Sequence, residues 1–139
     1  MSVSRQHTVY IEAPAGDILR ILLDVGALPY WNPAFSEVWA DLPATVGLPI
    51  PVRVRGLLTG ELVYDRISDR EIAMTIQVPG LTERCTWQLD VAPGGTTVTH
   101  AFTQSGWLAE LLEPSTRDAA SLRVTRLRKR VAQALAVAS

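Results

Sequence analysis

The sequence lacks several features that would assign the chain to a common class of protein. It has one cysteine, Cys85, among 139 residues, which excludes an intrachain disulfide and any cysteine-based zinc site. The net charge of -1 provides no field that would attract the chain to nucleic acid. No apolar run approaches the roughly 20 residues of a membrane span, and the polar N-terminus is unlike a signal peptide. We therefore expect a cytoplasmic protein with no nucleic-acid partner and no integral membrane segment.

The short motifs of several catalytic centres are also missing. There is no GxSxG pattern of a nucleophilic serine, and neither GxGxxG nor GxxxxGK occurs as a phosphate-binding loop. The two histidines, His7 and His100, have no third ligand at a suitable spacing, so a catalytic zinc site is not expected. We expect no cofactor and no metal.

The composition is that of one apolar globular domain, which we assign to residues 1–139. Hydrophobic residues make up 47% of the chain, and charged residues make up 19%. Because the charged fraction of an average domain is about 25%, the chain has more apolar surface than a solid core requires. A chain of this length buries enough surface for one core without disulfides.

Periodicity predicts a strand and then helices at the start of the chain. "SVSRQHTVYIEA" alternates with period two, which is typical of a strand. "APAGDILRILLDVG" has apolar residues at helical spacing, with Pro14 suited to the first turn and Gly26 suited to the end. "LPYWNP" predicts one short helical turn that Pro33 stops.

Six further strands and a long helix are predicted in the rest of the chain. The strand-like segments are separated by turn residues at short spacing, which favours an antiparallel meander. "WLAELLEP" is a short helix or an ordered loop, and Ser115 with Asp118 resembles the capping box of the next helix. That helix has an apolar stripe of Ala120, Val124, Leu127, Val131, Ala134, Leu135 and Ala138. Its other face, which we expect to be solvated, carries Arg123, Arg126, Arg128, Lys129 and Arg130.

This order of elements predicts an α+β fold in which a seven-stranded antiparallel sheet curls around the long C-terminal helix. One amphipathic helix covers only part of one face of such a sheet, so curling lets the concave face and the apolar stripe bury each other. The space between them is filled by side chains or by a ligand.

The chain resembles the START-like superfamily, also called SRPBCC or helix-grip, which includes polyketide cyclases, dehydrases and lipid-transport domains. The residues that carry the resemblance are "IEAP" at 11–14, Asp24, "WNP" at 31–33, "FTQSG" before the final helix, and the apolar stripe of that helix. The resemblance implies a helix-grip fold with a hydrophobic cavity between the sheet and the C-terminal helix. It leaves the function open, because the superfamily includes carriers, enzymes, receptors and co-chaperones.

Aromatic and apolar residues on the inward phase are the candidates for contact with a ligand. "LPYWNPAF" at 28–35 places bulky residues where regular structure is interrupted, and they either line a cavity or serve as packing wedges. Cys85 and Leu89 share the inward phase of one strand, and a thiolate nucleophile at Cys85 is not expected without a positive field. The candidate ligand-binding residues are Trp31, Phe35, Met74, Trp87, His100, Phe102 and Leu127.

Three polar residues are candidates for catalysis. His7 and His100 lie on the inward phase of the first and last strands, which the family topology pairs. They act either as acid and base or as buried, hydrogen-bonded residues without chemistry. Tyr64 is either a polar contact in the cavity or a core tyrosine. Arg53 and Arg55 are solvated if the neighbouring valines face inward, and they reach the cavity in the opposite register.

Three functions remain open from the sequence. The first is a carrier or sensor that binds a small hydrophobic molecule, and this is the one we favour. The second is a polyketide cyclase or dehydratase-like enzyme that acts on a carbonyl substrate in the same cavity. The third is a protein-interaction domain with a filled core. The ligand and the oligomeric state are not specified by the sequence.

Overall fold

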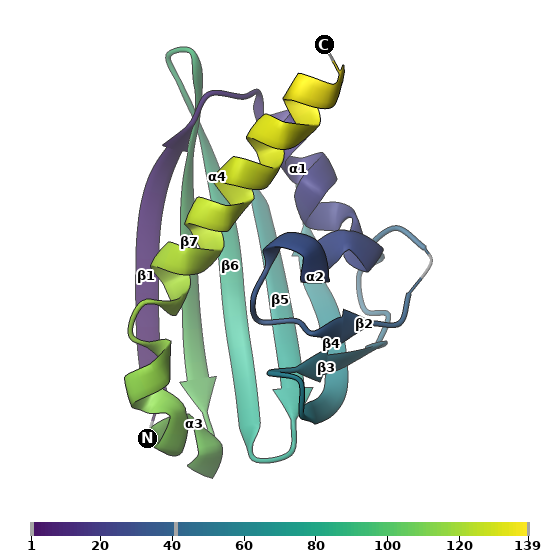
Figure 1. Ribbon diagram of the computed structural model, residues 1–139, viewed down its shortest axis with the longest axis vertical. Coiled ribbons are helices and arrows are strands. Elements are labelled where there is room, and N and C mark those ends of the chain that lie inside the picture. The colour runs from purple at the N-terminus through teal and green to yellow at the C-terminus, as the bar shows by residue number, and fades with distance from the viewer. Residues whose placement is uncertain (1, 41, 139) are drawn as a thin grey trace.

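The computed structural model describes residues 2–40 and 42–138, which form one sheet with helices on its inner face (Figure 1). The strands are β1 Ser2–Ile11, β2 Glu37–Val38, β3 Ile50–Val54, β4 Leu58–Ile67, β5 Glu71–Val78, β6 Leu81–Ala92 and β7 Gly95–Ser105. The helices are α1 Ala15–Leu23, α2 Leu28–Trp31, α3 Trp107–Leu112 and α4 Ala119–Ala138, and the two 3-10 turns are η1 Val25–Ala27 and η2 Glu113–Thr116.

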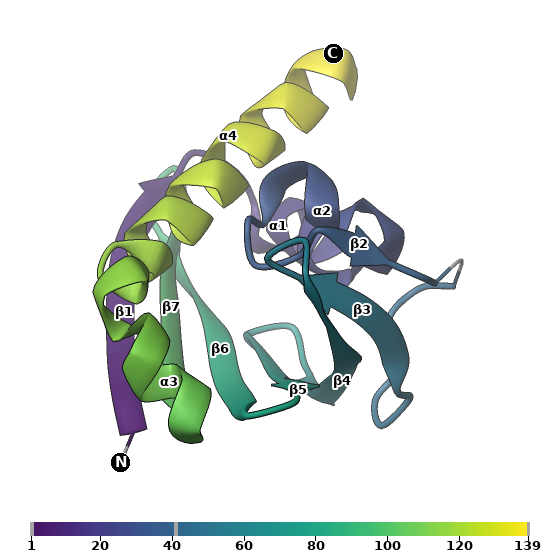
Figure 2. The same cartoon turned by 60° about the horizontal axis from the view of Figure 1, so that its bottom comes forward.

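The sheet has the strand order β1-β7-β6-β5-β4-β3-β2, and all its strand pairs are antiparallel. This confirms the predicted α+β architecture and the meander from β2 to β7. The sheet curls so that α4 lies across its concave side, while α1 and α2 cover the part nearer β3 and β4 (Figure 2). Alternate residues of the central strands face α4, as the period-two pattern predicts.

The tight turn between β5 and β6 depends on a glycine. Gly80 has a φ of 81°, which is the left-handed region where a side chain is disfavoured. A Cβ at this position would also lie 2.6 Å from the ring of Trp107, at the start of α3. Gly80 therefore lets α3 pack against this end of the sheet.

The interrupted segment "LPYWNPAF" forms α2 and the turn that follows it. The N–H of Ala34 donates to Asn32 Oδ1 at 3.0 Å, which closes the turn after the helix. Trp31 and Phe35 are buried, whereas Tyr30 is 77% exposed. Two of the three large aromatic residues in this segment therefore belong to the interior.

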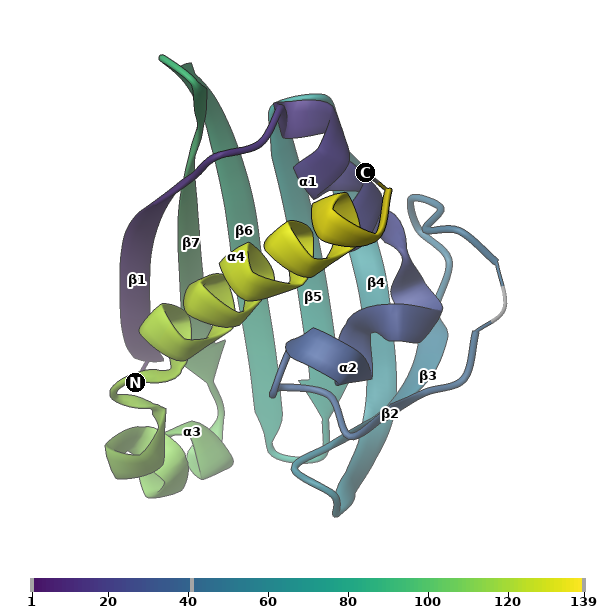
Figure 3. The ribbon, with the colours of Figure 1, turned by 45° about the horizontal axis from the view of Figure 1, so that its top comes forward.

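Helix α4 has the predicted length but begins later than expected. Glu113–Thr116 forms a 3-10 turn, and the Ser115 hydroxyl donates to the carbonyl of Leu112 at 2.8 Å, so Ser115 does not cap α4. Val124, Leu127 and Val131 are buried against the sheet as predicted. Helix α4 crosses the sheet from beside β1 toward α1 (Figure 3), and Ala134 and Ala138 of the predicted stripe, in its C-terminal turns, are exposed.

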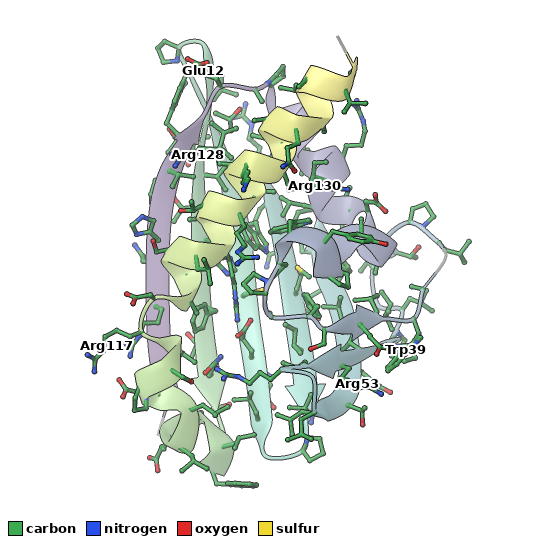
Figure 4. All side chains as sticks on the ribbon, viewed as in Figure 1. Glu12, Trp39, Arg53, Arg117, Arg128 and Arg130 are labelled. Carbon is green, nitrogen blue, oxygen red and sulfur yellow. The ribbon has the colours of Figure 1, made fainter. Side chains whose placement is uncertain are left out.

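The face of α4 is tested by a matched pair of substitutions. Leu127 is fully buried, whereas Arg128, labelled in Figure 4, is exposed. We expect Leu127→Asp to lower the free energy of unfolding by about 3 kcal/mol or more, because it buries an unpaired charge. Arg128→Asp should change it by about 0.5 kcal/mol or less. Urea denaturation of both variants measures the difference, and equal midpoints would contradict the assigned face.

Candidate functional site

The middle of the space between the sheet and α4 is filled by side chains. Trp87 lies edge-on to Trp31 with ring centroids 5.5 Å apart, and His100 stacks on Trp87 at 3.7 Å. The cluster continues to Phe102, whose ring centroid is 6.0 Å from that of His100. All seven residues expected to bind a ligand are buried in this interior: Trp31, Phe35, Met74, Trp87, His100, Phe102 and Leu127. The four aromatic members of this set, Trp31, Trp87, His100 and Phe102, pack in a row.

A pocket of about 250 Å³ lies beside this core, at the end of the sheet near the start of α4. Its volume is slightly below the usual range of ligand pockets, about 300–1,000 Å³. None of the seven expected ligand-binding residues lines it. Its apolar walls include Val54, Ile76, Val78, Leu81, Ala119 and Leu122. Its polar lining includes Glu83, Gln104 and Arg123, which are buried, and Arg55, Ser115 and Asp118, which are exposed.

The buried polar residues form an ion pair between α4 and β6. Arg123 Nη1 and Nη2 donate to Glu83 Oε2 and Oε1, each at 2.9 Å. Gln104 Nε2 donates to Glu83 Oε1 at 2.9 Å. The guanidinium also lies over the ring of Phe102, with Cζ 4.6 Å from the centroid. We call Glu83, Gln104 and Arg123 the polar floor of the pocket.

Each charged group of the pair offsets the desolvation cost of burying the other. Burial alone raises the pKa of the Glu83 carboxyl, but the charge and hydrogen bonds of Arg123 and the hydrogen bond of Gln104 bring this pKa below its ordinary value. Burial alone lowers the pKa of Arg123, and the Glu83 carboxylate raises it above its ordinary value. Both groups are therefore charged at neutral pH.

His100 is neutral and has both ring nitrogens engaged. Its Nε2 lies 3.3 Å from Arg123 Nη1, and its Nδ1 lies 3.0 Å from the carbonyl oxygen of Thr86. Because a guanidinium only donates and a carbonyl only accepts, the proton is on Nδ1. Burial and then the Arg123 charge lower the pKa of His100 to about 3. His100 is thus a core residue that supports Arg123, and it has no free nitrogen facing the pocket.

His7 and Tyr64 also lie away from the pocket lining. His7 pairs directly with His100 across β1 and β7, as expected, but it is exposed because β1 is an edge strand of the sheet. The Tyr64 hydroxyl donates to the carbonyl of Leu22 at 2.7 Å and is fully buried. Burial raises the pKa of both Tyr64 and Cys85, so neither is ionised at neutral pH. The three residues proposed for catalysis do not converge.

The two arginines of β3 have different surroundings. Val52 and Val54 face inward, so Arg53 points outward, where it pairs with Glu37 at 2.8 Å and lies near Trp39 (Figure 4). Arg55 follows the end of the strand with a φ of 55°. This change of backbone direction brings its Nη2 to 3.1 Å from the Ser115 hydroxyl, at the exposed side of the pocket.

The three residues of the polar floor were not identified from the sequence, although the periodicities of α4, β6 and β7 place them on inward faces. Arg123 was assigned to the solvated face, and this is wrong, since the residue is 6% exposed. It lies four residues before Leu127, a helical spacing that places both on one side of α4. Glu83 is two residues from Cys85, and Gln104 is two residues from Phe102, so each continues the inward phase of its strand.

Within residues 2–40 and 42–138, no group of three or more His, Cys, Asp or Glu side chains is placed to hold a metal ion. No helix in the same residues is long and apolar enough to cross a membrane.

Comparison with known proteins assigns the chain to a family. The model of the family described as polyketide cyclase / dehydrase and lipid transport matches residues 2–139. The chain belongs to this family. No sequence among the curated proteins matches it. The description of this family names lipid transport, so the family indicates hydrophobic ligands as a class.

Solved structures confirm the helix-grip fold. A START superfamily protein from Mycobacterium smegmatis has a TM-score of 0.70 at 19% identity, covering 94% of this chain and 97% of the other. The ZhuI aromatase/cyclase from Streptomyces sp. R1128 has a TM-score of 0.72 at 16% identity, covering 97% and 96%. A truncated norcoclaurine synthase from Thalictrum flavum has a TM-score of 0.72 at 13% identity, covering 94% of each. At these identities the likeness concerns the fold alone.

The low pKa of His100 predicts a pH dependence of stability. In the unfolded chain a histidine binds a proton below about pH 6.5, whereas folded His100 stays neutral down to about pH 3. The unfolded state therefore binds more protons between these values, and stability falls as the pH falls. We expect the free energy of unfolding to fall by about 1.5 kcal/mol more from pH 6.5 to pH 5 in the wild type than in His100→Gln.

Urea denaturation at both pH values measures this difference. Glutamine keeps a donor and an acceptor but has no proton to gain. His7→Gln, at the exposed partner position, is the matched control and should keep the wild-type dependence. An unchanged pH dependence in His100→Gln would contradict the assignment of a buried neutral imidazole.

Proposed function

We propose that this chain is a carrier or sensor that binds a small, mostly apolar molecule in the pocket beside the start of α4. The observation that supports this most strongly is the combination of apolar walls with a buried polar floor in one pocket of about 250 Å³. Apolar walls with a few fixed polar groups are the usual composition of a small-molecule site. The family membership supports the same class of ligand.

The size of the pocket limits the ligand. The aromatic cluster around Trp87 and His100 occupies the middle of the interior, so a ligand would enter only the end of the space between sheet and helix. A compact molecule of one or two rings suits this space better than a long-chain lipid. A site that reaches the exposed residues Arg55 and Asp118 would leave one end of the ligand near solvent.

An enzyme that acts on a carbonyl substrate in the same pocket is the second candidate. It is favoured by one observation, since buried charged groups in a pocket often mark a catalytic site. General acid–base catalysis requires a group that exchanges its proton near the working pH. The pKa of Glu83 is lowered, that of Arg123 is raised and that of His100 is lowered to about 3, so these groups keep fixed protonation states near neutral pH. The electrostatics therefore support binding over acid–base chemistry.

A substitution that fills the pocket with a larger side chain should weaken ligand binding and leave the core intact. Ala119 lines the pocket, and Ala134 is an exposed alanine of the same helix. We expect the wild type to bind one equivalent of 2-methylnaphthalene, which is a small apolar probe. We expect Ala119→Phe to weaken this binding at least about tenfold, while Ala134→Phe stays within about twofold.

Tryptophan fluorescence titration and native mass spectrometry measure the affinity and the stoichiometry of this binding. Thermal melts establish that both variants are folded. Wild-type affinity in a folded Ala119→Phe variant would place the probe elsewhere and contradict the proposed site. Turnover of a carbonyl substrate that is lost in Glu83→Gln, with binding of that substrate retained, would favour the enzyme.

A further inference from the structure

A second pocket, of about 300 Å³, lies between α2 and α4. It shares no lining residue with the apolar pocket near the start of α4. The residues that α4 contributes are three or four positions apart, so they lie on one side of that helix. We call this site the basic groove, and it is lined by Tyr30, Trp31, Arg126, Lys129, Arg130 and Gln133.

The basic residues of the groove have no acidic partner. Helix α4 contains no Asp or Glu, and neither residue type lines the groove. Among the residues that the structure describes, no ion pair includes Arg126, Lys129 or Arg130. Like charges three and four positions apart on a helix repel each other and lower its stability. An anion bound in the groove would offset this repulsion.

The helix dipole does not account for the cluster. The dipole stabilises a positive charge only near the last turn of a helix. Arg126, Lys129 and Arg130 precede the last turn of α4, which contains no basic residue. Arg123, on the same helix, is different because its charge is paired with Glu83. The groove therefore concentrates positive charge that no acidic group in the described chain balances.

The charged ends of these side chains are within reach of a ligand. The Arg130 guanidinium faces the ring of Tyr30, with Cζ 5.9 Å from the ring centroid. This cation–π contact directs Arg130 from α4 toward α2, across the groove. Arg126 and Lys129 are exposed, so their long side chains can turn toward an anion in the groove without leaving solvent.

We propose that the basic groove binds a phosphate monoester group, carried either by a small soluble molecule or by a lipid headgroup. Such a group has a charge of about −1.5 to −2 at pH 7 and three acceptor oxygens. It can accept hydrogen bonds from Arg126, Lys129 and Arg130 together, and arginine binds phosphate oxygens in pairs. A carboxylate has one charge and two oxygens, so it would balance less of the cluster. The inference is independent of the ligand of the apolar pocket.

Two soluble probes test the recognised group. Phenyl phosphate carries a phosphate monoester, and benzoate carries a carboxylate on the same ring. Isothermal titration calorimetry at low ionic strength, where charges are least screened, measures both dissociation constants. We expect the wild type to bind phenyl phosphate at least about fivefold more tightly than benzoate. Equal affinities would overturn the preference for phosphate.

Two double variants locate the binding. Arg126→Gln with Lys129→Gln removes two charges of the groove at exposed positions, and we expect it to bind phenyl phosphate at least about tenfold more weakly than the wild type. Arg117→Gln with Arg128→Gln removes the same charge at exposed positions outside the groove (Figure 4), and it should stay within about twofold. Thermal melts establish that both are folded. Equal losses in the two would show a response to net charge alone and overturn the groove as the site.

The apolar pocket is separated from the groove by a third variant. Ala119→Phe, which fills the apolar pocket, should leave the affinity for phenyl phosphate within about twofold of the wild type, because Ala119 does not line the groove. Binding of phenyl phosphate that is lost in folded Ala119→Phe would assign this probe to the apolar pocket and overturn the groove. Loss of 2-methylnaphthalene binding alone would leave the groove unaffected.

Vesicles distinguish the two sources of phosphate. Phosphatidic acid has a phosphate monoester headgroup, so flotation with phosphatidylcholine vesicles that contain or lack it measures binding to a headgroup. Binding to phosphatidic acid that is lost in the groove variant would support the inference with a lipid as the source. Phenyl phosphate binding without vesicle binding would support it with a soluble molecule as the source. If neither probe shows binding that depends on Arg126 and Lys129, the inference is wrong.

Discussion

The ion pair between Arg123 and Glu83 is the interaction on which the arrangement of this molecule most depends. It joins the first half of α4 to β6 at a point where both residues are almost completely buried. Breaking a buried pair by removal of one partner typically costs about 3–5 kcal/mol, because the remaining charge is left uncompensated. The structure surrounds the pair with further contacts: Gln104 binds the carboxylate, while His100 and Phe102 contact the guanidinium. The orientation of the Gln104 amide follows from it, and the Arg123 charge adds to the burial that keeps His100 neutral.

The pair also divides the interior into a solid part and an open part. On one side of Arg123, aromatic rings from α2, β6 and β7 pack against one another. On the other side, the short strand β3 and the start of α4 leave room for the pocket. The polar floor thus closes the inner end of an apolar pocket. This arrangement shows how one helix-grip domain combines a packed aromatic cluster with a small apolar pocket.

Much of the fold was predictable from periodicity, and the functional site was less so. Alternation in β5, β6 and β7 and the stripe around Leu127 were sufficient to predict a curled sheet around a helix, because burial on one face imposes these patterns directly. The residues that line the pocket were not predictable, since the same inward aromatic residues either line a space or fill it. Arg123 was misassigned because a charged residue on a helix is usually solvated, and only a partner such as Glu83, 40 positions away in the chain, makes its burial favourable. Arg55 reaches the pocket through a left-handed backbone that the valine pattern of β3 does not reveal.

The most direct test of the proposed site is a crystal structure of the wild-type chain with 2-methylnaphthalene. We expect density for the naphthalene rings between the apolar walls near Ile76 and Leu122. Glu83 and Arg123 should keep their bidentate contact beneath it. A probe bound elsewhere would contradict the claim that this pocket is the binding site.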